Sequence, residues 1–253
     1  MSGREVTATL FRSDETAIAY QSERVTLFHG DALEVVLDLP SSSVDLIATD
    51  PPYGVSWQSN RRTEKFARIA NDDGTFDVMG ALGVALPTLK RGRHVYVFGP
   101  ADLSKLPLTE SAELIWDKGV FGSGDLTSPW GPQHERITFA TYEISKANRE
   151  KGYGRLAARV RRGSIVHAQR PQGSGVKRHP TEKPVALMRQ LIESSTVLGE
   201  TVLDPFAGSG STLVAAVLSG RRAVGIELDE GYCQVAAERL AAAEAMVAEV
   251  ESA

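Results

Sequence analysis

A glycine-rich turn between two apolar segments constrains the fold of this chain more than any other feature. The short apolar run Thr201-Val202-Leu203 precedes the turn, and residues 213–218 continue it as an apolar stretch with helical character. Glycines permit a tight turn and let the backbone approach a ligand closely at the N-terminus of a helix. The turn itself reads Asp204-Pro205-Phe206-Ala207-Gly208-Ser209-Gly210-Ser211-Thr212. The segment therefore predicts a strand, a turn and a helix of an α/β fold, with a ligand at the turn.

The same turn matches the dinucleotide-binding fingerprint only in part, because Leu213 stands where that fingerprint has its third glycine. Nineteen residues after Gly208, Glu227 ends the next apolar run, residues 223–226. An acid at this place can accept hydrogen bonds from both hydroxyls of a ribose. Glu227 is therefore a candidate ligand of a nucleoside.

A second motif, Asp50-Pro51-Pro52-Tyr53, ends the apolar run of residues 44–48. Prolines cannot donate ladder hydrogen bonds, so a buried strand must stop here and the chain leaves in an extended form. A carboxylate and a carbonyl can both accept from one NH2 group, and a ring beside them can stack on a flat heterocycle. The motif suits the exocyclic amine of a nucleobase. A simple strand stop, with Tyr53 as ordinary packing, is the alternative.

Together these motifs resemble the S-adenosylmethionine-dependent amino DNA methyltransferases of adenine N6 and cytosine N4. The order of the motifs is that of the subgroup in which Asp-Pro-Pro-Tyr precedes Phe-x-Gly-x-Gly. The resemblance extends from about residue 25 to residue 240 and includes Gly30-Asp31 and His179-Pro180-Thr181-Glu182-Lys183-Pro184. It implies an α/β fold with a doubly wound, mainly parallel, seven-stranded Rossmann-like sheet. Ligands of open sheets bind at the carboxyl ends of the strands, where both motifs are expected.

The resemblance also implies residues for the cofactor, S-adenosylmethionine: Asp31 for the adenine amine, Glu227 for the ribose and Asp204 for the ammonium. The helix N-terminus after the turn would receive the cofactor carboxylate. On the residues alone, Asp31 is explained equally well as a helix N-cap and Lys183 as a solvent-facing residue. The implied cofactor-binding set is Asp31, His179, Thr181, Lys183, Asp204, Pro205, Phe206, Gly208, Ser209, Gly210, Ser211, Thr212 and Glu227, and the catalytic set is Asp50, Pro51, Pro52 and Tyr53.

The expected reaction is methyl transfer to N6 of adenine in duplex DNA. Hydrogen bonds to the Asp50 carboxylate and the Pro51 carbonyl would localise the amine lone pair and stabilise the positive charge that develops on nitrogen. Because the amine is paired inside a duplex, the base would have to flip out and stack on Tyr53.

Several alternatives to this reaction stay open. Within the family, Asp at position 50 is typical of adenine enzymes and Ser of cytosine-N4 enzymes, so N4-cytosine is the first alternative. RNA or protein amine methylation and a non-catalytic DNA-binding homologue are further ones. A dinucleotide oxidoreductase would use Glu227 and the turn, but it gives no reason for the motif at 50–53.

Charge is unevenly distributed along the chain. The net charge is -4, yet residues 146–178 hold ten Lys or Arg against the single acid Glu150. A basic strip on an acidic body is the expected footprint of phosphate binding, and a solvated surface loop is the alternative. We expect residues 143–178 to be a DNA-recognition insertion and the loop at 54–74 to close on DNA. The candidate DNA-binding residues are Arg61, Arg62, Lys146, Arg149, Arg155, Arg159, Arg161 and Arg162.

The chain of 253 residues suits one α/β domain, residues 1–253. No signal-length apolar segment and no run near the roughly 18 apolar residues of a membrane span are present, so no membrane partner and a cytoplasmic location are expected. With Cys233 as the single cysteine and no zinc spacing, neither an internal disulfide nor a metal is expected. The resemblance permits a homodimer and a cognate restriction endonuclease.

Periodicity and turn chemistry predict the remaining elements. Strands are expected at 25–28, 44–48, 94–98, 114–116 and 136–142, and helices at 32–39, 76–89, 185–197 and 230–250. Residues 6–12 and 15–21 alternate between apolar and polar side chains and predict a peripheral hairpin.

Overall fold

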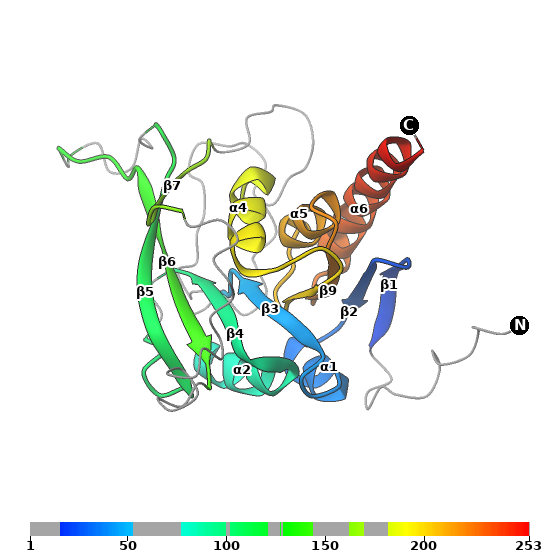
Figure 1. Ribbon diagram of the computed structural model, residues 1–253, viewed down its shortest axis with the longest axis horizontal. Coiled ribbons are helices and arrows are strands. Elements are labelled where there is room, and N and C mark those ends of the chain that lie inside the picture. Colours follow the sequence, from blue (N-terminus) through cyan, green and yellow to red (C-terminus); the bar gives the residue numbers. More distant parts are fainter. Residues whose placement is uncertain are drawn as a thin grey trace, which may run out of the picture.

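The computed structural model describes residues 16–52, 77–99, 102–120, 127, 129–143, 162–169 and 182–252. Within these ranges one sheet of nine strands runs in the order β1-β2-β9-β8-β3-β4-β6-β5-β7 (Figure 1). Its strands are β1 (Ala17–Gln21), β2 (Val25–His29), β3 (Val44–Thr49), β4 (Leu89–Phe98), β5 (Leu108–Asp117), β6 (His134–Tyr142), β7 (Ile165–His167), β8 (Thr201–Asp204) and β9 (Arg222–Glu227). The helices are α1 (Ala32–Asp38), α2 (Val78–Ala85), the 3-10 turn η1 (Leu86–Thr88), α4 (Val185–Ser195), α5 (Ser211–Leu218) and α6 (Glu230–Glu251).

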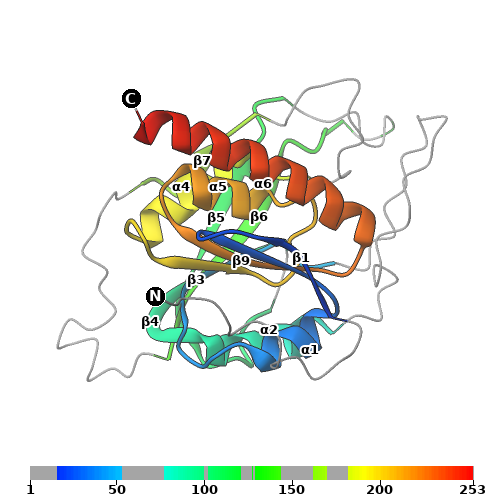
Figure 2. The same ribbon diagram turned by 90° about the vertical axis from the view of Figure 1, so that its right-hand side faces the viewer.

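The centre of the sheet is parallel and is covered on both faces. Strands β2, β9, β8, β3 and β4 are parallel neighbours, whereas β6 is antiparallel to both β4 and β5. Helices α4, α5 and α6 pack on one face, and α1 and α2 pack on the other (Figure 2). This is the doubly wound α/β fold that the sequence predicts.

Strand β3 shows why a continuous apolar run lies at the middle of such a sheet. Every residue from Val44 to Thr49 is buried. Leu46 and Ala48 pack under α4 and α5, and Ile47 packs on the opposite face. Because helices cover both faces, both sets of side chains must be suited to burial, which a parallel interior strand achieves with an apolar run. The two prolines that follow remove the backbone donors needed to extend the strand.

The strand count differs from the seven expected. The two further strands, β1 and β7, lie at the two edges of the sheet. Strand β1 pairs antiparallel with β2, so residues 17–21 form their hairpin with 25–29, whereas residues 6–12 lie outside the described residues. Strand β7 belongs to the predicted basic insertion and pairs parallel with β5.

Two boundaries in the middle of the chain were also wrong. The helix expected at 76–89 ends at Ala85, because Pro87 has no backbone N–H, and a 3-10 turn follows it. Strand β4 then begins at Leu89 rather than at 94. Its pairing with β3 shifts register, and Gly92 takes a φ of 82°, a conformation suited to glycine, so the early part of β4 carries no clean alternation.

The missing third glycine of the fingerprint is compensated from the neighbouring strand. Leu213 is fully buried on α5, where it faces β9. A Cβ atom on Gly225 would come within 2.4 Å of the Leu213 Cδ1 atom and 3.2 Å of the Ala207 Cβ atom. The glycine that allows close packing of helix on strand therefore stands on β9 instead of on the helix.

Candidate active site

Four acidic residues lie at the carboxyl ends of four adjacent strands. Asp31 follows β2, Glu227 ends β9, Asp204 ends β8 and Asp50 follows β3, and these strands are consecutive in the sheet. The helix after β8 covers one face, and the helix that follows β3 along the chain covers the other. The boundary between β8 and β3 is thus the point where the winding reverses, and ligands of open α/β sheets bind in the crevice at such points.

Asp204 joins the two sides of this point. Its Oδ1 atom accepts from Thr49 Oγ1 of β3 at 2.8 Å and from the Phe206 backbone N–H at 3.1 Å. Its Oδ2 atom accepts from Thr212 Oγ1 at 2.5 Å. Burial raises the pKa of Asp204 to about 6, although these hydrogen bonds favour the ionised form. Asp204 therefore fixes the turn against β3, and its expected contact with the cofactor ammonium stays a prediction.

Asp204 should make the stability of the protein depend on pH. Because its pKa is raised above 3.8 in the fold, the folded state holds this proton more tightly, and stability falls as pH rises from about 4 through 6. We expect this group to lower the free energy of unfolding by about 2 to 3 kcal/mol over that interval. Urea unfolding at several pH values should show that Asp204→Asn lacks this component. A difference between the two proteins that does not change with pH would contradict the assignment.

The glycine-rich turn is held by its backbone and by α6. Gly210 caps α5 with φ 80° and ψ 19°, in the left-handed region. A Cβ atom there would lie 2.9 Å from the Ala236 Cβ atom of α6. Position 210 therefore requires glycine both for its conformation and for space.

The carboxylate of Glu227 is held between two loops. Oε2 accepts from the Gly208 backbone N–H at 2.7 Å, and Oε1 accepts from the Asp229 N–H at 2.8 Å. Burial raises the pKa of Glu227, while these two backbone donors partly offset the effect. The acid thus stands against the turn, with its orientation set before any ligand binds.

We expect Glu227→Ala to weaken cofactor binding by about 1 to 3 kcal/mol, the usual effect of removing a charged hydrogen-bond partner. Isothermal titration calorimetry with S-adenosylmethionine measures this directly. Glu230→Ala is the matched control, because Glu230 is an exposed acid three residues away. Equal affinities in the two variants would remove Glu227 from the cofactor site.

Asp31 caps a helix. Its side chain accepts from the Leu33 backbone N–H at 2.8 Å, which makes it the N-cap of α1. The Gly30 N–H donates to the Glu227 backbone carbonyl at 3.0 Å, so Asp31 follows directly from a contact with β9. The capping role is observed, and contact with the adenine amine stays a prediction.

Lys183 contacts the acid of the Asp-Pro-Pro motif. Its Nζ atom donates to Asp50 Oδ2, lies 3.4 Å from Glu135 Oε2 and stands 5.0 Å from the centre of the Phe98 ring. Burial alone would lower the pKa of Lys183, but the charges of Asp50 and Glu135 outweigh burial and raise it. The lysine is therefore a buried cation, and its expected cofactor contact stays a prediction.

Sequence reasoning missed three charged residues at this edge. Glu135 of β6 forms an ion pair with Lys118 at 2.6 Å in addition to its contact with Lys183. Arg239 of α6 donates to the Ser209 carbonyl at 2.5 Å and pairs with Glu182 at 3.1 Å, which ties the turn to the segment before α4. None of the three belongs to a local motif, and the helical pattern around Arg239 was the only signal available.

Several expected site residues fall outside the described residues. These are Tyr53, Arg61, Arg62, Lys146, Arg149, Arg155, Arg159, Arg161, His179 and Thr181. Arg162 is described, and its Nη2 atom forms an ion pair with Glu193 of α4 at 3.2 Å. In the described part of the chain, no helix is long and apolar enough to cross a membrane, and no group of three metal-ligating side chains gathers.

The donor set at this edge fits S-adenosylmethionine. Glu227 offers carboxylate oxygens oriented against the turn, and the start of α5 offers the positive end of a helix dipole. Gly208, partly exposed beside Glu227, leaves room for a ligand to approach the backbone. An acid for the ribose and a helix N-terminus for a carboxylate are the groups that such a nucleoside requires.

Comparisons with known proteins agree on one family. The N6/N4 DNA methylase model matches residues 115–238. The inferred methylase YubD of Escherichia coli K12 is 35% identical over 84% of this chain and 88% of its own length. YhdJ of the same strain, a DNA adenine methyltransferase, is 27% identical over 87% of this chain and 84% of its own.

Solved structures share the fold. The cytosine-N4-specific PvuII DNA methyltransferase superposes with a TM-score of 0.64 at 16% identity, covering 88% of each chain. A DNA modification methylase of Thermus thermophilus, TTHA0409, in complex with S-adenosyl-L-methionine, gives a TM-score of 0.58 at 26% identity over 88% of this chain and 96% of its own. With the sequence relatives, this establishes that the chain belongs to the N6-adenine and N4-cytosine family of DNA amino methyltransferases.

Proposed function

We propose that this protein transfers a methyl group from S-adenosylmethionine to the N6 amine of adenine at specific sites in duplex DNA. The observation that carries the proposal is the position of Asp50-Pro51 at the carboxyl end of β3, next to the glycine-rich turn that follows β8. Amino methylation needs an acceptor site for NH2 beside a site for the cofactor. The two motifs are brought together by Thr49, the residue before Asp50, through its hydrogen bond to Asp204.

The cofactor is S-adenosylmethionine, which supplies a methyl group on a sulfonium and therefore reacts with a weak nucleophile. The turn, Glu227 and the start of α5 would hold it. The Asp50 carboxylate and the Pro51 carbonyl would accept the two amine hydrogens, and this favours a pyramidal nitrogen with its lone pair directed away from the ring. Asp50 then faces a nitrogen that becomes positive during transfer, so its charge stabilises the transition state more than the ground state.

Adenine rather than cytosine is favoured by Asp50, the residue typical of adenine enzymes with this order of motifs. YhdJ is named for adenine, and PvuII methyltransferase is named for cytosine N4, so both kinds of base occur among the similar proteins. Both bases present an amine with two hydrogens. N4-cytosine is therefore the second candidate.

We further propose residues 143–178 as a DNA-recognition insertion within a single domain. The pairing of β7 with β5 supports it, because this strand attaches part of the insertion beside the same edge of the sheet as Asp50. The basic residues of this segment, with Arg61 and Arg62, would contact phosphates and offset the few kcal/mol needed to unstack a base. A homodimer and a cognate endonuclease stay expectations.

Transfer of a radiolabelled methyl group from the cofactor to DNA, RNA or protein tests the class of acceptor. We expect label in duplex DNA, with affinity falling steeply as salt rises, because phosphate contacts release counterions. Label in RNA or protein alone would reject the DNA assignment. Cofactor binding without transfer to any of the three would indicate a non-catalytic DNA-binding homologue.

A further inference from the structure

Four side chains of alternating charge run along the carboxyl edge of the sheet, beginning at the proposed catalytic acid. Lys183 contacts Asp50 Oδ2 and lies 3.4 Å from Glu135 Oε2. Lys118 pairs with Glu135 Oε1 at 2.6 Å. The residues come from the end of β3, the segment before α4, the start of β6 and the end of β5, so four separate parts of the chain converge.

The two cations of this chain are buried. Lys183 is 9% exposed and Lys118 is 3% exposed, and each ammonium lies about 5 Å from an aromatic ring, that of Phe98 or Trp116. A buried ion pair is weak evidence for stability, since apolar residues of similar volume are often as stabilising. Four such charges at one edge therefore call for an explanation other than stability.

The arrangement also divides the charge of Lys183. A lysine beside Asp50 alone would neutralise the carboxylate and compete with a substrate amine for its oxygens. Glu135 is the second acceptor of the same ammonium, and Lys118 in turn balances Glu135. Burial disfavours the charge of Glu135, but Lys183 and Lys118 outweigh burial and lower its pKa, so the carboxylate remains ionised.

We propose that Glu135 and Lys118 are positioning residues that act through Lys183 to set how strongly Asp50 accepts the substrate amine. The proposal rests on the function assigned to Asp50 above. In this arrangement Lys183 orients the carboxylate by holding Oδ2, and Glu135 keeps the lysine from neutralising it. The strength of Asp50 as an acceptor is then a property of three strands and the segment before α4 rather than of the Asp-Pro-Pro motif alone.

Other charged groups face this chain and must be separated from it. Asp204 of β8 is near enough for the charge of Asp50 to contribute to its raised pKa. Beyond Lys118, Asp117 Oδ2 of β5 lies 3.0 Å from His167 Nδ1 of β7. We therefore follow the carboxyl group of Asp50 itself, rather than a pH profile to which all of these groups contribute.

The decisive experiment titrates Asp50 in the full chain labelled with 13C at the aspartate carboxyl carbons, with the signal assigned by its absence in Asp50→Asn. Removing the negative charge with Glu135→Gln should lower the pKa of Asp50. Removing a positive charge with Lys183→Met or Lys118→Met should raise it, with Lys183→Met shifting it by about one unit or more. Lys118→Arg and Lys183→Arg, which keep the charge, should stay near wild type.

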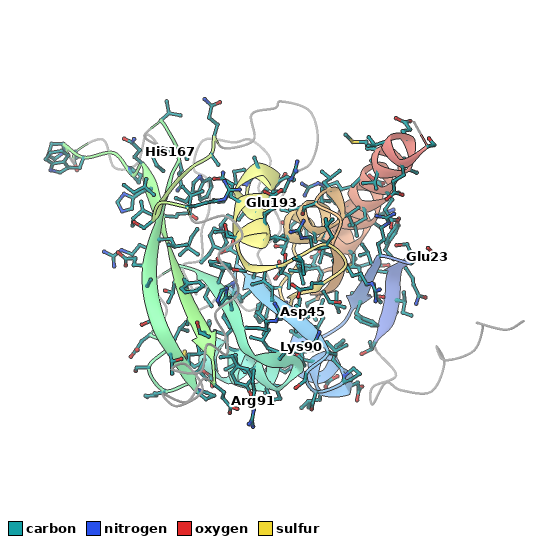
Figure 3. The ribbon with its side chains drawn as sticks, viewed as in Figure 1. Glu23, Asp45, Lys90, Arg91, His167 and Glu193 are labelled. Atoms are coloured by element: carbon teal, nitrogen blue, oxygen red, sulfur yellow. The ribbon has the colours of Figure 1, made fainter. Side chains whose placement is uncertain are left out.

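Glu135→Gln should also reduce kcat by about tenfold, with the KM for S-adenosylmethionine unchanged, because Lys183 then binds Asp50 alone. Lys90→Met is the matched control. Lys90 pairs with buried Asp45 at 2.8 Å near the beginning of β3, and both residues lie close together in Figure 3, away from His167. Loss of this ion pair should leave kcat and the pKa of Asp50 as they are.

Two results would overturn the proposal: an unchanged pKa of Asp50 in Glu135→Gln, or a shift in the same direction as in Lys183→Met. A folded Glu135→Gln protein with the wild-type kcat would overturn it as well. The titration needs no substrate, so it stands apart from the identity of the acceptor. If the wild-type protein methylates no DNA while the opposite shifts are observed, the proposed function fails and the electrostatic coupling holds.

Discussion

Replacing Asp50 by alanine should reduce methyl transfer by about 10²- to 10³-fold, the usual effect of removing one preorganised group that stabilises transition-state charge. Cofactor affinity should change little, because Glu227 and the turn after β8 are left in place. The Lys183 ammonium keeps Glu135 as a neighbour at 3.4 Å, so the buried cation retains an acceptor. Single-turnover rates with labelled cofactor, together with calorimetric cofactor binding, measure the two effects separately.

Asp50→Asn provides the sharper companion variant. It preserves the volume of the side chain, but its carbonyl oxygen and its NH2 group cannot serve Lys183 and the substrate amine at the same time. We expect a loss close to that of alanine. Retention of a tenth or more of the wild-type rate in either variant would show that Asp50 does not hold the amine.

Gly210→Ala should destabilise the protein and abolish cofactor binding together. The left-handed conformation at φ 80° costs a residue with a side chain about 1 to 2 kcal/mol, and the new Cβ atom would press against Ala236. Overpacking of this kind adds about 1 to 3 kcal/mol. Because α5 begins at this residue, any shift that relieves the contact also displaces the turn from Glu227.

Gly199→Ala is the matched control for this change. Gly199 has a φ of 77°, nearly that of Gly210, but no atom lies within 4 Å of the position of its Cβ. Thermal or urea unfolding of both variants therefore isolates the contact with Ala236 from the conformational penalty. Equal losses in the two variants, or full cofactor affinity in Gly210→Ala, would refute the close packing of α6 on the turn.

The elements that hold the main motifs could be predicted because their signals are local. The apolar run before Asp50 ends at two prolines, and the run before Asp204 ends at a glycine-rich turn, so strand, stop and helix are all encoded within a few residues. The adjacency of β3 and β8, confirmed by their parallel pairing, came from the family resemblance and from the general rule for open sheets.

The charged residues around these motifs could not be predicted in the same way. Glu135 and Lys183 meet through the fold, and Arg239 contacts Ser209, thirty residues away in sequence. Each alone is indistinguishable from an ordinary surface residue. Lys183 was singled out only through the resemblance, and its contact with Asp50 depends on how the segment before α4 crosses the end of β3.

Edge strands were the least predictable part of the sheet. Strand β7 has three residues, of which Val166 is buried while Ile165 and His167 are exposed, so its alternation is too short to register in the sequence. The polar start of β5 conceals a strand that extends from Leu108 to Asp117, whereas only 114–116 was expected. Both strands gain their hydrogen bonds from partners already ordered in the sheet, which local sequence does not reveal.

The central claim is that the amine of adenine is methylated at Asp50, and nucleoside analysis tests it most directly. Duplex DNA is incubated with the protein and S-adenosylmethionine, digested to nucleosides and examined by mass spectrometry, with Asp50→Ala as the parallel sample. N6-methyladenine in the wild-type sample, and its loss in the variant, is the predicted result. N4-methylcytosine in place of N6-methyladenine, or equal methylation by both proteins, would contradict it.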